Sequence, residues 1–301
     1  MEKIIAVVFA VFIPYCVHPY LLRRVAVLPG RARNLVIQYC FAALLAWVVA
    51  FVGHWIMGTH FEWKAQMLVV VGIGVANAVA CYWHWKATAI NQAITSLSTW
   101  LDDIIPLVLG LFILNEFQFL NAMVVVGIIL AVGSAILFAT QTASLDGVKP
   151  SSVRQIYKYI LMYSVIWGVA GFAMRYLSVK ENMLVWDFIS SWYSGSIVGA
   201  LAVYYLADQT DRGDASTLRE AMKKTAMLTG SVVSSLAATY WAKSLVPLVF
   251  TQPIFMVSEM VFPTMIGLFI FGEHKHFTRL GWILIFCGLV GGLIIATHLP
   301  K

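Results

Sequence analysis

Long apolar segments, each about as long as a membrane is thick, dominate the chain. A helix that crosses the hydrocarbon core of a bilayer needs about 20 mostly apolar residues, whereas a strand of a membrane barrel needs only about ten. Ten segments have the length of such helices: residues 4–22, 35–57, 66–85, 88–114, 119–139, 156–177, 183–207, 225–242, 245–271 and 278–297. Charged residues make up 11% of the chain, against roughly 25% in soluble domains. We therefore expect an all-α integral membrane protein with ten transmembrane helices.

The positive charges indicate how the chain is oriented. If the ten spans alternate in direction, six of the 20 Lys and Arg residues fall on the side of the N-terminus: Lys3, Lys64, Arg175, Lys180, Lys243 and Lys301. The other fourteen fall on the opposite side. Because Lys and Arg collect on the cytoplasmic side, we expect both termini to lie outside the cytoplasm, in the cell (inner) membrane. The net charge of +6 is therefore no indication of nucleic-acid binding.

A sequence motif occurs twice, 157 residues apart. Residues 102–116 read DDIIPLVLGLFILNE, and residues 259–273 read EMVFPTMIGLFIFGE. We interpret this match as an internal repeat that divides the chain into a first five-helix unit (1–140), a connecting loop (141–155) and a second five-helix unit (156–301). A unit with an odd number of spans must enter the membrane in opposite senses in its two copies. We expect two inverted repeats around a central cavity, the architecture of many secondary transporters.

Each copy of the motif places an acid near the middle of a span, four residues before a proline. An acid at that depth costs about 2.5–3.5 kcal/mol and normally faces a cavity or the interior of a bundle. Pro106 and Pro263 remove the N–H groups that would bond the carbonyls of Asp102 and Glu259, so we expect a kink at each proline. A carboxylate beside a freed carbonyl suits a cation or a proton. The alternative is an ordinary kink whose acid pairs with a Lys or Arg.

Other polar and aromatic residues extend these two sites. Asn91, Thr95 and Ser98 follow one helix face toward Asp102, and Gln252 and Met256 do the same toward Glu259. Asp103 points about 100° away from Asp102 around the helix axis. It either pairs with a cation from another span or shares a proton with Asp102. Four aromatic residues are candidates for a cage around an ammonium group, with simple packing as the alternative: Tyr15, Tyr82, Trp167 and Tyr240.

Several kinds of site are absent or only weakly indicated. We expect Glu116 and Glu273 to cap the helices that follow them. His274 and His276 are a weak signal for a metal, and we expect neither a metal nor a cofactor. No phosphate-binding loop or nucleophile elbow occurs, so we do not expect an enzyme. The four cysteines lie inside apolar segments and form no disulfide framework. The N-terminus enters its apolar segment without a cleavage site, which indicates a retained first span.

The chain resembles the ten-span drug/metabolite transporter superfamily, and within it the EamA-type carriers. The resemblance covers nearly the whole chain and depends on W-G-x6-R at residues 167–175 and on the proline–glycine–glutamate ends of the fourth and ninth spans. It implies two inverted five-helix repeats around a cavity lined mainly by spans one, three, four, six, eight and nine. It also implies movement of small metabolites by exchange or proton coupling. The chain departs from the family pattern in span one, which reads PYCVHPY at 14–20, at Asn115, and in its inferred orientation.

These features favour a secondary transporter of a small cationic or zwitterionic metabolite, such as an amine or an amino acid. Asp102 and Glu259 would attract the positive group or carry coupling protons. The expected partners are a small-molecule substrate, the lipid bilayer and protons, with no nucleic acid, in a monomer or homodimer. Two alternatives stay open: a proton-coupled exporter of neutral or aromatic amino acids or drugs, and a membrane accessory protein or enzyme that transports nothing.

Overall fold

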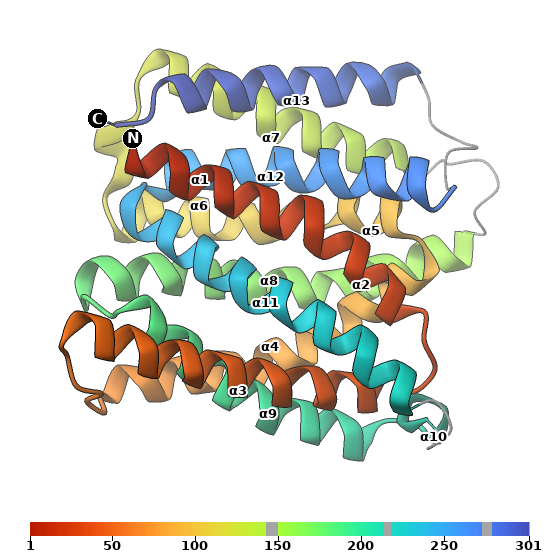
Figure 1. The fold of residues 1–301 in the computed structure, drawn as a ribbon. Coiled ribbons are helices and arrows are strands. Elements are labelled where there is room, and N and C mark those ends of the chain that lie inside the picture. The colour runs from red at the N-terminus through yellow and green to blue at the C-terminus, as the bar shows by residue number, and fades with distance from the viewer. Residues whose placement is uncertain (143–149, 214–217, 273–278, 301) are drawn as a thin grey trace.

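The computed structural model describes residues 1–142, 150–213, 218–272 and 279–300, and these residues form helices without any strand. The helices lie side by side in one bundle (Figure 1). Both chain ends lie at the same end of this bundle, where the Lys3 ammonium donates a hydrogen bond to the Pro300 carbonyl at 3.0 Å. We call this the terminal end of the bundle, and the other, where α10 (Gln209–Arg212) lies, the α10 end.

Seven helical segments of the described chain are long and apolar enough to cross a membrane. They are Glu2–Ala26 (α1 Glu2–Val11, η1 Phe12–Val17 and α2 His18–Ala26), α3 (Arg31–Met57), α4 (Ala65–Ile90), Gln92–Ile113 (α5 Gln92–Ser98 and α6 Leu101–Ile113), Ser151–Lys180 within α8 (Pro150–Lys180), Leu248–Ile270 (α12 Leu248–Met265 and η4 Ile266–Ile270) and α13 (Arg279–Thr297). The other three predicted spans correspond to α7 (Ala122–Thr142), α9 (Val185–Leu206) and α11 (Leu218–Leu245), which have shorter apolar stretches or more polar residues. The short η2 (Glu116–Phe119) joins α6 to α7.

The fourth predicted span is wrong as one continuous helix, because it is interrupted twice. Asn91 is extended (φ −159°, ψ 120°), and its side chain caps α5 by accepting the Ile94 N–H at 2.8 Å. A second break follows at Thr99, before α6 begins at Leu101. The α5 hydroxyl groups bond carbonyls three or four residues back, including Ser98 to Ile94 at 2.8 Å, and such bonds compete with helix continuation. Asn91 is therefore a helix cap and does not extend the polar face toward Asp102.

Proline-associated irregularities also interrupt the first and ninth spans. The π-helical turn η1 contains Pro14, and the π-helical turn η4 begins three residues after Pro263. Such turns leave backbone groups displaced from regular helical bonding and occur frequently at functional sites. The three interrupted spans come together in the bundle, since α12 contacts η1, α5 and α6.

Helices from the two halves of the chain interleave. From the first half, α4 packs against α8 and α9, α3 against α9, and α7 against α13. Figure 1 shows α3, α4 and α9 along one side of the bundle and α7 with α13 along the opposite side. Between them lie α1, α6, α8, α11 and α12. The segments that carry the predicted acids, α6 and α12, are thus in the central layer and in contact.

Glycines allow α4 and α9 to pack with their backbones in close contact. A Cβ atom on Gly74 would collide with the Trp192 carbonyl, and one on Gly195 would collide with the Val71 carbonyl. Small residues of this kind let helices approach closely, which is how helix pairs gain packing energy in a membrane. Backbone carbonyls cannot move aside as a side chain can, so this contact fixes the two helices relative to each other.

We expect Gly74→Ala to destabilise the protein by about 1–3 kcal/mol, because the added methyl group overpacks a backbone contact. Gly72 lies in the same helix, is exposed, and has nothing within 4 Å of the position of its missing Cβ. Gly72→Ala is therefore a matched control that should leave the melting temperature unchanged or slightly raised. Thermal unfolding of the purified protein in detergent measures both variants, and equal melting temperatures would contradict the close α4–α9 contact.

Candidate functional site

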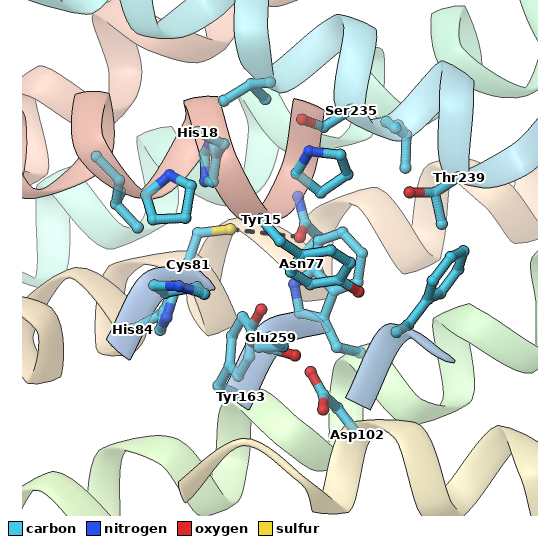
Figure 2. Close-up of a pocket in the computed structure, with 18 of the residues that line it drawn as sticks. Tyr15, His18, Asn77, Cys81, His84, Asp102, Tyr163, Ser235, Thr239 and Glu259 are labelled. Carbon is cyan, nitrogen blue, oxygen red and sulfur yellow. Dashed lines mark hydrogen bonds between the residues drawn. The ribbon is translucent and has the colours of Figure 1, made fainter. Parts of the chain in front are cut away.

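A cavity of about 150 Å³ lies between the helices of the central layer (Figure 2). Its lining residues come from η1, α2, α4, α5, α6, α8, α11 and α12, and also from α3 and α9. These elements include all six spans that the resemblance assigns to a cavity, together with the second and seventh. Ligand sites for drug-sized molecules usually have about 300–1,000 Å³, so this cavity suits a small metabolite.

Three carboxyl groups meet in the cavity and form its acidic cluster. One carboxylate oxygen from each of Asp102, Asp103 and Glu259 lies within 4.8 Å of the other two. The side chains of Asp102 and Glu259 point toward each other in Figure 2. Asp102 and Asp103 are 9% and 5% exposed, and one oxygen of each lacks a hydrogen-bond partner among the described residues. The two aspartates are therefore buried and incompletely satisfied, and Glu259 is partly buried beside them.

The break in the fourth span explains how the two aspartates are accommodated. Asp102 and Asp103 lie in the first turn of α6, which begins in the middle of the bundle because of the break. The N-terminus of a helix carries a partial positive charge, so carboxylates are stabilised there. The Thr99 hydroxyl at the same break donates its hydrogen to the Ser96 carbonyl at 2.9 Å. The interruption thus supplies a helix end to the two aspartates of the cluster.

The electrostatics of the cluster require added positive charge. Two carboxylates 4.8 Å apart repel each other by about 3 kcal/mol at an effective dielectric constant of about 20. Three ionised carboxylates in a buried cavity are correspondingly unstable unless a cation or protons balance them. The cluster therefore has the chemistry to bind a cation, to hold exchangeable protons, or to do both in turn.

Lys243 lines the cavity, although its place just after the predicted span 225–242 indicates a position near the membrane surface. The α11 helix continues to Leu245, and the side chain of Lys243 is 4% exposed in the cavity wall. Its charge interacts with those of Asp103 and Asp102. The stretches 80-ACYWHWKA-87 and 238-ATYWAKS-244 share A-x-Y-W and a nearby lysine, Lys86 or Lys243, and this was the available sequence signal for it.

Four further predicted residues line the cavity together with the acidic cluster. Tyr15 lies against the Phe255 ring with 5.9 Å between centroids, and Trp167 lies 5.7 Å from the Trp192 ring. Gln252 is 1% exposed, and its side-chain oxygen has no hydrogen-bond partner within the described chain. Pro263 lines the wall one turn beyond Glu259, whereas Pro106 is not among the lining residues.

Tyr82 and Tyr240, proposed as a symmetric aromatic pair, both lie outside the cavity. The Tyr82 hydroxyl donates a hydrogen bond to Asp211 at 2.6 Å. The Tyr240 hydroxyl donates to the Met183 carbonyl at 2.7 Å, and its ring stacks on Phe188. Each tyrosine follows a residue that does line the cavity, Cys81 or Thr239. The side chains of consecutive helical residues point about 100° apart, so both tyrosine rings point away from the cavity.

Neutral polar residues form a part of the cavity that the sequence analysis missed. They are Gln38, Asn77, His18, His84 and Tyr163. The His84 ring stacks on Tyr163 with 4.3 Å between centroids, and His18 Nδ1 lies 3.4 Å from the Ser231 hydroxyl. Asn77 donates to the Tyr39 hydroxyl at 3.0 Å. The spacing of Asn77, Cys81, His84 and Thr88 on one face of α4 was the available signal.

A buried polar network lies at the terminal end of the bundle. Glu116 pairs with Arg175 at 3.1 Å, and Arg175 donates to the carbonyls of Lys243 and Ser244 at 2.8 and 3.0 Å. Glu116 also accepts the Val249 N–H at 3.1 Å. Glu116 thus caps α12, and the prediction that it caps the following helix is wrong. Glu273, His274 and His276 lie outside the described residues.

A second network lies at the α10 end. Asp211 accepts the hydrogen bond from Tyr82 and pairs with Lys86 at 3.0 Å and with Arg31 at 3.2 Å. Burial alone would raise the pKa of the Asp211 carboxyl, but the hydrogen bonds from Tyr82 and Lys86 and the charges of Lys86 and Arg31 outweigh it. The pKa of this carboxyl is therefore below its ordinary value, and the network is ionised at neutral pH.

Comparison with known proteins supports the fold and gives no function. No model of a known family matches the chain, and no curated protein matches it. Among 27 matching chains of solved structures is one described only as "Crystal structure of protein". It aligns with a TM-score of 0.64 and 12% identity over 97% of this chain and 96% of that chain. At this identity the likeness concerns the arrangement of the helices alone.

We expect Asp211→Asn to destabilise the protein by about 1–3 kcal/mol, because it removes the charge that Lys86 and Arg31 share. A carboxyl whose pKa is lowered by folding stabilises the fold above its ordinary pKa and loses this effect only as the pH falls through the lowered value. The loss in melting temperature should therefore be the same at about pH 7 and about pH 5. Asp208→Asn, on an exposed neighbour, is the control. If the difference in melting temperature between Asp211→Asn and wild type disappeared as the pH fell from about 7 to about 5, the ionised network would be contradicted.

Proposed function

We propose that this protein is a secondary transporter of a small cationic or zwitterionic metabolite, such as an amine or an amino acid. The observation that carries the proposal is the acidic cluster in a buried cavity among apolar helices. Ionisable groups inside a membrane bundle are costly and typically mark the path of a substrate or of protons. The resemblance to drug/metabolite transporters, based on sequence motifs alone, agrees with this reading.

The proposal includes ten membrane spans in two inverted repeats. Chain ends at the same end of a bundle imply an even number of crossings, and Lys3 and Pro300 are in contact. The seven apolar segments alone would place the termini at opposite ends. Adding α7, α9 and α11 gives ten spans, with five in each half of the chain. Under this proposal α5–α6 and α12 are repeat counterparts, and each brings an acid and a proline to the central layer.

The cavity wall is suited to an ammonium group. Carboxylates attract the charge, and aromatic rings stabilise it through cation–π contact worth about 0.5–2 kcal/mol per favourable ring. Tyr15, Phe255, Tyr163 and Trp167 supply such rings around the cavity. A zwitterion would also need donors for its negative group, and Gln38 offers an amide group in the same cavity.

The two polar networks are suited to act as gates for alternating access. Glu116–Arg175 joins η2, α8 and the corner between α11 and α12 at the terminal end, while Asp211 joins α10 to α3 and α4 at the α10 end. Both networks are intact in this structure. Opening one while the other stays closed would expose the cavity to one side of the membrane at a time. The interruptions at η1, Thr99 and η4 provide hinge positions near the cavity.

Proton coupling follows from the same cluster. Protons on the carboxyl groups balance part of the negative charge of the empty cavity, and a cationic substrate replaces them when it binds. Release of the substrate on the other side lets the protons return. Substrate and protons then move in opposite directions, and no separate energy source such as ATP is required.

A second candidate is a proton-coupled transporter of neutral or aromatic amino acids. The part of the cavity with His18, His84 and Asn77 favours it, because these groups hydrogen-bond neutral molecules and stack on rings. In that case the acidic cluster would carry protons only. Reconstituted protein that transports phenylalanine but no amine would favour this candidate over the first.

We expect Asp102→Asn and Glu259→Gln each to reduce amine uptake into liposomes at least tenfold, which corresponds to about 1.4 kcal/mol of lost binding. The loss of charge leaves the shape of the cavity intact, so the variants should still insert and fold. Glu62→Gln alters an exposed acid in the loop between α3 and α4 and serves as the control. Full uptake by both cavity variants would remove the electrostatic basis of the proposal.

We expect short tags at the two termini to be accessible from the same face of the membrane. The positive-inside distribution of Lys and Arg predicts that this is the outer face. Protease or antibody access to tags on intact cells, compared with permeabilised cells, measures both points. Tags on opposite faces would rule out ten spans, whereas both tags on the cytoplasmic face would reverse only the orientation.

A further inference from the structure

Lys243 is the single Lys or Arg among the described residues that line the cavity. It lies in the last turn of α11 and is 4% exposed. Within the described chain its ammonium group forms no ion pair closer than 4 Å with the acidic cluster. A buried cation is costly unless a negative charge compensates it, and this one lies in the field of Asp103 and Asp102. The ammonium is thus attracted by the cluster without being fixed to it.

The ammonium group of Lys243 occupies the space that Gly171 leaves open by having no side chain. A Cβ atom on Gly171 would lie 2.8 Å from Lys243 Nζ, 3.3 Å from Pro106 Cγ and 3.5 Å from Gln252 Nε2. These atoms belong to α8, α11, α6 and α12, so the ammonium lies where four helices meet. The Phe255 ring centroid is 5.8 Å from the ammonium in this same position, within the range of cation–π attraction. The four-carbon side chain of lysine has several rotatable bonds, so the ammonium can leave this position when another cation enters the cavity.

We propose that the Lys243 ammonium group is a tethered counter-ion, which balances the acidic cluster of the empty transporter and gives way to a substrate cation. This inference rests on the proposed function and names how the same site is regulated. Substrate and lysine compete for Asp102, Asp103 and Glu259. The empty cavity then keeps its charge partly balanced by the protein itself, and an empty transporter can return across the membrane without leaving carboxylates uncompensated.

The backbone of Lys243 links this exchange to the terminal-end network. Arg175 holds the carbonyls of Lys243 and Ser244, and Arg175 is itself paired with Glu116. One residue therefore contacts the cavity through its side chain and the network through its backbone. When a substrate displaces the ammonium, the change therefore reaches the corner between α11 and α12. The terminal-end network would have to open at this corner.

The test compares wild-type protein with Lys243→Met and Lys243→Arg in detergent, using tetramethylammonium and ethanolamine as probes in calorimetric titrations. Met removes the competing charge but keeps an unbranched apolar side chain, so we expect Lys243→Met to bind both probes about tenfold more tightly or better. Arg keeps the charge, and we expect an affinity within about threefold of wild type. Lys180→Met, on the exposed last turn of α8, is the control and should bind as wild type does.

Liposome assays of the same variants supply a second readout. Exchange of internal for external ethanolamine never needs the empty transporter to reorient, whereas net uptake does. We expect Lys243→Met to retain exchange and to lose at least about nine-tenths of net uptake, a pattern that general misfolding would not produce.

Unchanged or weaker binding by Lys243→Met, with melting temperature and exchange retained, would overturn the inference while leaving the proposed function intact. Melting temperature also identifies a misfolded Met variant. If the Met variant is misfolded, Lys243→Arg is the test. Loss of probe binding by a folded Lys243→Arg variant, which keeps the positive charge, would contradict the counter-ion role. Absence of probe binding by wild type and variants alike would contradict the proposed function and this inference with it.

Discussion

Repulsion among three carboxyl groups inside the bundle, two of them buried and one partly buried, is the constraint on which the rest of the structure depends. Asp102, Asp103 and Glu259 lie within 4.8 Å of one another at carboxylate oxygens, in a bundle whose surroundings are apolar. Such a cluster is stable only with local compensation, and the fold supplies two kinds. The α6 helix begins beside the acids, and Lys243 places a positive charge in the same cavity.

Rigid and irregular parts of the bundle are separated in space. Close glycine packing holds α4 against α9 on one side, whereas the segments around the cluster contain breaks, π-helical turns and prolines. Polar networks close each end, one through Glu116 and Arg175 and one through Asp211. A rigid frame, hinged central segments and closable ends are the features that alternating access requires.

The sequence predicted much of this and missed the rest for identifiable reasons. The repeated acid–proline motif located Asp102 and Glu259, since a mid-span acid is unusual whatever its neighbours. The assignment of Tyr82 and Tyr240 failed because a shift of one residue turns a side chain by about 100°, which repeat matching does not resolve. Lys243 and the partner of Glu116 were missed because both depend on where α11 ends and α12 begins, and boundaries are the least certain part of sequence reading.

The central claim is that the acidic cluster binds the positive group of a substrate. The most direct measurement is an experimental structure of the protein with a bound amine at saturating concentration. The account predicts density for the ammonium group within about 4 Å of carboxylate oxygens of Asp102, Asp103 or Glu259, with the Lys243 ammonium displaced from its present position. Density for the amine at another site, with the cavity empty, would contradict the account.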